Sequence, residues 1–139
     1  MTVLDENTPF GAQVARRLVG DQVIWLTTIG AGTTPQPNPV WFLWQDSTFL
    51  IYTAPAAKRL AHLARNPRVA LNFNSTETGG EVVVFTGTAR VGEPVSAATV
   101  ADYVRKYTQG FVDIEMTEAE FFQTYSTPIH ITPDHLRGF

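Results

Sequence analysis

The spacing of apolar residues changes several times along the chain, and these changes mark helices and strands. Phe10, Val14 and Leu18 recur at helical spacing between Thr8, a typical N-cap, and Gly20. This pattern predicts a helix at the start of the chain. The helical period returns over residues 56–65, 96–107 and 117–125, which predict three further helices. The last of these opens with the spacing of a capping box, Thr117 to Glu120.

The segments between the helices are rich in β-branched and aromatic residues, which is typical of strands. We expect strands over residues 23–29, 40–44, 48–53, 68–73 and 81–91, and a last strand over residues 129–139 that is interrupted at Pro133. Gly87 indicates a bulge or bend. Residues 40–44 and 48–53 are apolar on both faces. A partner subunit or a flat cofactor would cover the second face.

The order of these elements indicates the fold class. Strands and helices do not alternate regularly, which disfavours a doubly wound parallel sheet. We therefore predict a mainly antiparallel barrel with helices in the gaps between strands. The chain of 139 residues has the length of one domain, and no composition shift divides it. We treat residues 1–139 as a single domain.

Composition excludes several classes of function. The net charge is -3 and the basic residues are dispersed, so nucleic acid is not an expected partner. The absence of cysteine excludes disulfides, thiolate nucleophiles and iron–sulfur clusters. Neither a secretory leader nor an apolar run of membrane-spanning length is recognisable. We expect a cytoplasmic protein with no membrane partner.

A candidate anion site lies where the strand over residues 48–53 gives way to a helix. Thr53 ends the strand, Pro55 turns the chain, and Lys58, one of two lysines, begins the helix. Backbone N–H groups at a helix N-terminus, a lysine charge and a hydroxyl together suit a phosphate. The alternative is a common strand-to-helix turn whose lysine is only solvated. The spacing alone does not decide between them.

An ordered series of short motifs resembles the pyridoxamine 5'-phosphate oxidase-like superfamily. The motifs are residues 37–42, residues 49–53, Lys58, residues 66–71 and residues 87–89, within a likeness that runs from Gln22 to Arg90. The similarity is greatest to the short actinobacterial branch that uses the deazaflavin coenzyme F420. The resemblance implies a split β-barrel with peripheral helices. It also implies a homodimer with cofactor sites at the subunit interface.

The resemblance also implies site residues. Lys58 and Thr53 match positions that bind the cofactor phosphate, and Tyr52 precedes Thr53 on the same strand. The residues that match the strand along the cofactor ring are Asn38, Pro39, Val40 and Trp41. Ala57 falls where relatives can carry a phosphate-binding arginine, which leaves Lys58 as the main positive charge. No metal is expected, because the histidines show no paired metal spacing.

The implied activity is hydride transfer from reduced F420 to a small conjugated acceptor, with FMN as the alternative cofactor. No catalytic residue is assigned, since the cofactor supplies the chemistry and solvent can supply a proton. The C-terminal strand with tryptophan and arginine that completes a pyridoxamine phosphate site has no match, so that substrate is not expected. A cofactor- or haem-binding dimer without catalysis is the alternative, with His62, His130 and His135 as candidate haem ligands. A dimer without any cofactor remains a third hypothesis.

Two residue types have a packing interpretation beside the functional one. Trp41 could stack on a planar cofactor, but aromatic residues on strands are usually core or dimer contacts, as we expect for Trp25 and Trp44. His62 falls on the polar side of its helix. We therefore expect His62 to be solvated.

Overall fold

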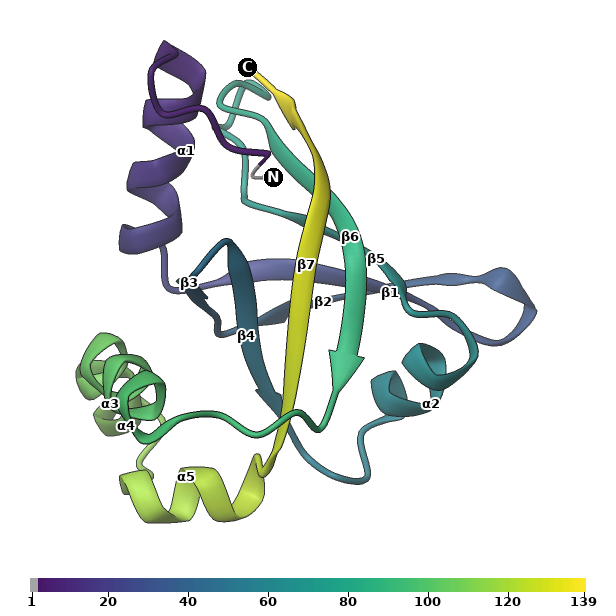
Figure 1. Ribbon diagram of the computed structural model, residues 1–139, viewed down its shortest axis with the longest axis vertical. Coiled ribbons are helices and arrows are strands. Elements are labelled where there is room, and N and C mark those ends of the chain that lie inside the picture. The colour runs from purple at the N-terminus through teal and green to yellow at the C-terminus, as the bar shows by residue number, and fades with distance from the viewer. Residues whose placement is uncertain (1–2) are drawn as a thin grey trace.

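The protein is built on one antiparallel sheet of seven strands in the order β2-β1-β5-β6-β7-β4-β3. The computed structural model describes residues 3–139, so the first two residues of the predicted domain lie outside the description. The sheet curls into a half-barrel, with β6 and β7 running along its length (Figure 1). The predicted antiparallel barrel with peripheral helices is thereby confirmed. Among the described residues, no helix is both long and apolar enough to span a membrane.

The strands are β1 Ile24–Ile29, β2 Pro35–Val40, β3 Leu43–Gln45, β4 Thr48–Thr53, β5 Arg68–Asn72, β6 Val83–Val91 and β7 Thr127–Gly138. The helices are α1 Pro9–Gly20, α2 Lys58–Arg65, α3 Ala97–Lys106, α4 Thr108–Asp113 and α5 Glu118–Thr124, with a short 3-10 turn over Ala31–Thr33. Thr8 caps α1, and the Thr117–Glu120 capping box of α5 is present, both as predicted. The helix α4 was not predicted.

The strand predicted over residues 40–44 is confirmed only in part. Leu43–Gln45 forms β3 and pairs with β4, but the chain leaves the sheet at Trp41 and Phe42, which separate β2 from β3. Pairing with β1 begins at Pro35 and continues through Pro37 and Pro39. Prolines are tolerated there because β2 is an edge strand, on which an N–H position can face away from the neighbouring strand.

The predicted interruption at Pro133 is wrong, since β7 continues through it. Thr86 pairs with His135 and Gly87 with Pro133, so Asp134 is an extra residue between them. This bulge confirms the irregularity predicted at Gly87. A proline fits beside a bulge because the regular ladder of hydrogen bonds is already disrupted there.

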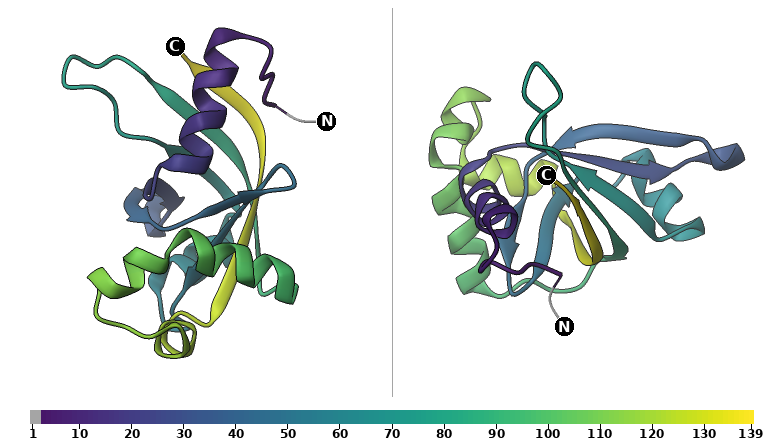
Figure 2. Two further views of the ribbon diagram at one scale, coloured as in Figure 1. Left: turned by 90° about the vertical axis from the view of Figure 1, so that its left-hand side faces the viewer. Right: turned by 90° about the horizontal axis from the view of Figure 1, so that it is seen from above.

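The strand β4 is buried on both faces. Phe49 and Ile51 belong to a core inside the curled sheet, to which α1 contributes Val14 and Leu18. Leu50 lies instead in a second core. Its other buried residues come from α3, the junction of α3 with α4, α4 and α5, in that order: Tyr103, Tyr107, Phe111 and Phe121. Figure 2 shows these helices gathered on one side of the molecule. The covering that we expected from a partner or a cofactor is thus supplied, over Leu50, by the chain itself.

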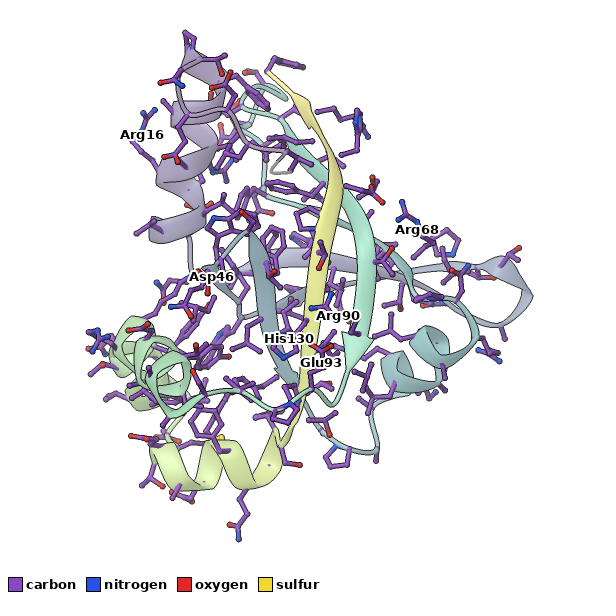
Figure 3. All side chains as sticks on the ribbon, viewed as in Figure 1. Arg16, Asp46, Arg68, Arg90, Glu93 and His130 are labelled. Carbon is purple, nitrogen blue, oxygen red and sulfur yellow. The ribbon has the colours of Figure 1, made fainter. Side chains whose placement is uncertain are left out.

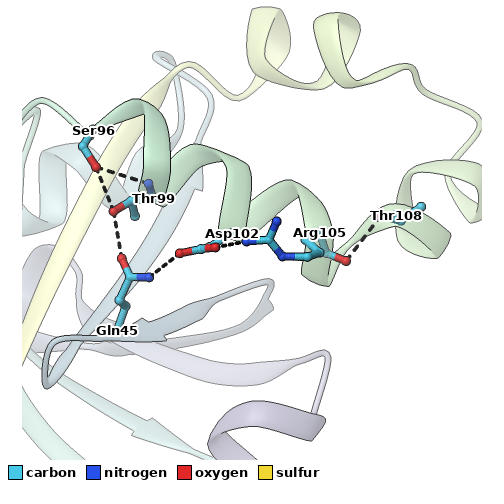
Figure 4. A network of polar contacts seen from close by, with 6 residues as sticks. All are labelled: Gln45, Ser96, Thr99, Asp102, Arg105 and Thr108. Atoms are coloured by element: carbon cyan, nitrogen blue, oxygen red, sulfur yellow. Dashed lines mark hydrogen bonds and ion pairs between the residues drawn. The ribbon is translucent and has the colours of Figure 1, made fainter.

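Polar contacts fix α3 against β3 (Figure 4). The Gln45 side chain donates through Nε2 to Asp102 at 2.7 Å and accepts from Thr99 Oγ1 at 2.8 Å. Ser96 caps the helix by accepting from the Thr99 N–H at 3.2 Å. These contacts place the buried face of α3 over β4.

Candidate functional site

The candidate site begins at the N-terminus of α2. Ala57 occupies the N-cap position and makes no side-chain capping bond, so the first N–H groups of α2 have no side-chain acceptor from the cap. Lys58 is exposed and Arg59 is half-buried. The helix start therefore combines two cations with N–H groups at the positive end of a helix dipole, a combination suited to an oxyanion.

A polar cavity of about 170 Å³ lies beside this helix start. Its wall is formed by Leu26, Thr28, Gln36, Asn38, Ala57, Lys58, Arg59 and His62. The cavity therefore joins residues of β1 and β2 to one face of α2. Of the predicted site residues, Asn38, Ala57 and Lys58 lie here.

A larger cavity of about 360 Å³ adjoins the polar one. Its wall is mostly aromatic and apolar, formed by Val23, Pro39, Val40, Trp41, Tyr52, Thr53, Arg59, Tyr103, Ile114, Phe121 and Tyr125. The predicted residues Pro39, Val40, Trp41, Tyr52 and Thr53 lie here. Thr53 is 4% exposed and does not line the same cavity as Lys58, although both were predicted to bind one phosphate.

Arg59 is the residue that both cavities share, and it was not among the predicted site residues. Burial lowers the pKa of its guanidinium. Within residues 3–139, its side chain has no carboxylate partner in an ion pair. A half-buried guanidinium without an acid partner is suited to a ligand anion. Its neighbour Lys58 was the predicted phosphate ligand, because it follows the strand-to-helix turn in the sequence.

Trp41 packs in the second core and also lines the aromatic cavity. Its ring lies 4.3 Å from the ring of Tyr107, nearly parallel, and 5.4 Å from that of Phe121. The two interpretations of Trp41 are therefore compatible. Trp44 packs against Phe49 at 4.7 Å in the core, and neither it nor Trp25 lines a cavity described here.

The backbone beside Trp41 is held by the end of α3. Tyr107 Oη accepts from the Phe42 N–H at 2.8 Å and lies 2.7 Å from the Gln22 carbonyl oxygen. Lys106 donates to the Phe42 carbonyl at 2.8 Å, with Nζ 3.6 Å from the centroid of the Phe42 ring. Burial lowers the pKa of Lys106 to about 8. These contacts hold the two residues between β2 and β3 in place, and with them Trp41, which lines the cavity.

Two tyrosines on the aromatic wall pack against each other. The rings of Tyr52 and Tyr103 meet edge to face at 5.0 Å. Burial raises the pKa of both hydroxyls. The Tyr103 side chain is fully buried, and its hydroxyl has no hydrogen-bond partner within residues 3–139. Both phenols are therefore neutral near pH 7.

The three histidines lie in different surroundings. His62 is half-buried and its Nδ1 lies 2.8 Å from Thr28 Oγ1, so the expectation of a solvated side chain is wrong. The helix turns this residue toward β1. His130 lies near Glu93 and Arg90 at one end of β6 and β7 (Figure 3), and its Nε2 is 3.2 Å from the Glu93 carbonyl. His135 is exposed. Only His62 lines one of the two cavities described here.

Comparisons with known proteins agree with this fold. A family model described as pyridoxamine 5'-phosphate oxidase matches residues 10–131. An F420 reductase of known structure has a TM-score of 0.65 at 16% identity, over 88% of this chain and 94% of the reductase. A FAD-binding protein from Mesorhizobium loti has a TM-score of 0.63 at 15% identity, over 90% of this chain and 88% of that protein.

Haem-handling proteins share the architecture as well. HutZ, a haem storage protein from Vibrio cholerae, has a TM-score of 0.68 at 13% identity, over 94% of this chain and 95% of HutZ. No curated protein matches the sequence. At these identities the structural likeness concerns the fold alone.

Proposed function

Because the chain belongs to the pyridoxamine 5'-phosphate oxidase family, we propose that it is an oxidoreductase that binds a flavin-type cofactor at the two adjoining cavities. The observation that carries this proposal is the sharing of Arg59 between a polar cavity and an aromatic one. A cofactor that joins a phosphate to a planar ring has the same two parts. The proposed reaction is hydride transfer from reduced F420 to a small conjugated acceptor, with FMN as the alternative cofactor.

The residues present fit such a cofactor. Lys58, Arg59 and the start of α2 would hold the phosphate, and Pro39, Val40 and Trp41 would flank the ring, while Asn38 lines the polar cavity. Arg59 would also supply the positive charge of the arginine that is missing at Ala57. The larger cavity is within the usual size of small-molecule sites, about 300–1,000 Å³. The bound cofactor supplies the hydride, while the protein orients the ring and excludes water.

The homodimer belongs to the same proposal. Val23 and Ile114 line the aromatic cavity and keep 36% and 41% of their surface exposed. A second subunit would cover this apolar rim and close the cavity toward solvent. Sedimentation equilibrium of the purified protein tests this, and a monomer at micromolar concentration contradicts it.

Fluorescence titration with F420, FMN and riboflavin tests the cofactor site. We expect Arg59→Met to weaken the binding of phosphate-bearing cofactors by about 1.5–3 kcal/mol, roughly ten- to a hundred-fold, because a charge-assisted contact is lost. Lys58→Met should have a smaller effect, since Lys58 is exposed. Arg65→Met is the matched control: Arg65 ends the same helix and lines neither cavity.

The same titrations separate the alternatives. Tighter binding of FMN than of F420 would favour the alternative cofactor, and failure of both to bind would contradict the proposal. Haem binding with a Soret shift that is lost in His62→Ala, in a protein that binds neither cofactor, would favour a haem-binding dimer. Turnover is tested with reduced F420 and a conjugated enone, by following the return of the oxidised cofactor's absorbance.

A further inference from the structure

His62 lies on the same face of α2 as the two cations of the polar cavity. It follows Lys58 by four residues and Arg59 by three, the spacings that place side chains side by side on a helix. All three line the cavity. The opposite wall carries Thr28, whose side chain is 3% exposed. The imidazole thus contacts β1 and lines the same cavity as the two cations.

The contact with Thr28 indicates which tautomer of the imidazole is present. Thr28 Oγ1 lies 2.8 Å from His62 Nδ1, and no other side-chain hydrogen bond of this hydroxyl is made within residues 3–139. A buried hydroxyl needs an acceptor for its hydrogen, and the Nδ1 lone pair is the acceptor at hand. Donation from Thr28 to Nδ1 leaves the proton of a neutral imidazole on Nε2. Nε2 is then a hydrogen-bond donor.

The Nε2 side of the ring lies beside Gly30. A β-carbon added at Gly30 would lie 3.4 Å from Nε2 and 3.1 Å from Gln36 Cγ. A side chain at this position would press on Gln36 and would reach van der Waals contact with the imidazole edge. Among the described residues, Nε2 makes no hydrogen bond. It is a donor without a protein acceptor in a cavity that also carries two cations.

We propose that His62 binds an oxyanion, with its Nε2–H donating to a phosphoryl oxygen beside Lys58 and Arg59. This inference rests on the proposed function. It adds a residue that recognises the phosphate through a directional hydrogen bond, beside the charges of Lys58 and Arg59. Thr28 is the positioning residue that holds the imidazole in the donating tautomer. The oxyanion is either the cofactor's own phosphate or a free phosphate.

FMN and riboflavin are a matched pair of ligands for the test, because they differ only in the phosphate. We expect His62→Leu to weaken FMN binding about ten-fold, the worth of one hydrogen bond to a charged group. Riboflavin binding should stay unchanged. His62→Gln should restore part of the loss, since its amide N–H can donate in place of the ring N–H. Inorganic phosphate, titrated as a competitor of FMN, tells whether free phosphate occupies the same site.

Two results would overturn the role of His62. One is an equal loss of FMN and riboflavin binding in His62→Leu, which would mean that His62 only packs in the cavity wall. The other is unchanged FMN binding in a variant that melts at the wild-type temperature. If the wild-type protein itself does not distinguish FMN from riboflavin, the oxyanion site of the proposed function fails instead. The two failures are therefore separable.

Discussion

Tyr103 and Tyr107 lie one helical turn apart, and both side chains are fully buried. Their hydroxyls differ. Tyr107 Oη accepts from the Phe42 N–H and lies within hydrogen-bond distance of the Gln22 and Phe42 carbonyl oxygens. Tyr103 Oη has no partner within residues 3–139. The same chemical group is thus satisfied at one position and desolvated without compensation at the other.

Removal of each hydroxyl tests this difference. Tyr107→Phe should lower the free energy of unfolding by about 1–3 kcal/mol, because the buried Phe42 N–H loses its acceptor. Tyr103→Phe should be neutral or slightly stabilising. Urea denaturation of the two variants gives the comparison, and equal losses would mean that the Tyr103 hydroxyl has a partner of its own.

Single residues of the site could be predicted only in part. Lys58 and Tyr52 follow from the strand-to-helix turn and the family motif, both local in sequence. Arg59 and His62 could not be chosen in this way. Their neighbours Thr28 and Gln36 come from β1 and β2, and helical spacing alone does not tell which polar side chain a distant strand will cover.

At the scale of elements, the bulge between β6 and β7 leaves no room for a side chain at Gly87. A β-carbon at Gly87 would lie 2.4 Å from the carbonyl oxygen of Thr132. The extra residue Asp134 accepts hydrogen bonds from Arg68 and from Thr86 Oγ1, and its bond to Arg68 is the main cause of its lowered pKa. The bulge therefore leaves a carboxylate on β7 that joins β5 to β6.

Gly87→Ala should destabilise the protein by about 1–3 kcal/mol, because the backbone of β7 must move to admit a methyl group. Gly20→Ala is the control, since its added β-carbon meets no atom within 4 Å. At the end of a helix, alanine should leave stability unchanged or raise it slightly. Thermal unfolding of both variants measures the difference, and similar melting temperatures would contradict the steric account.

Elements with local signals were predicted well, and those that depend on distant contacts were not. Helix caps at Thr8 and Thr117 are read from a few neighbouring residues. The break at Trp41 and Phe42 depends on Tyr107 and Lys106, more than sixty residues away. The passage of β7 through Pro133 likewise depends on Gly87 of the facing strand.

For the whole molecule, buried ionisable groups make stability depend on pH in two opposite directions. Burial lowers the pKa of Lys106 to about 8, whereas an unfolded lysine titrates near 10.4. The unfolded chain therefore binds more protons between these values, and stability rises with pH there. Burial raises the pKa of Tyr52, Tyr103 and Tyr107, so above about pH 10 the unfolded chain loses protons first and stability falls.

We expect the free energy of unfolding to rise by about 1–2 kcal/mol from pH 8 to pH 10, after allowance for the partial exposure of Lys106, and then to decline. Lys106→Met should abolish the rise and keep the decline. Urea titrations across this range measure both limbs. A wild-type curve that is flat from pH 8 to pH 10 would contradict the burial of the ammonium group.

The sheet order leaves β2 and β3 as its two free edges. On β2, prolines alternate at positions 35, 37 and 39, so a row of amide hydrogens is missing along the strand. β3 is only three residues long. A strand from another molecule would find few donors to pair with on β2 and little length on β3. Edge-to-edge growth into fibrils is therefore suppressed, and one of the prolines responsible, Pro39, also lines the proposed ring site.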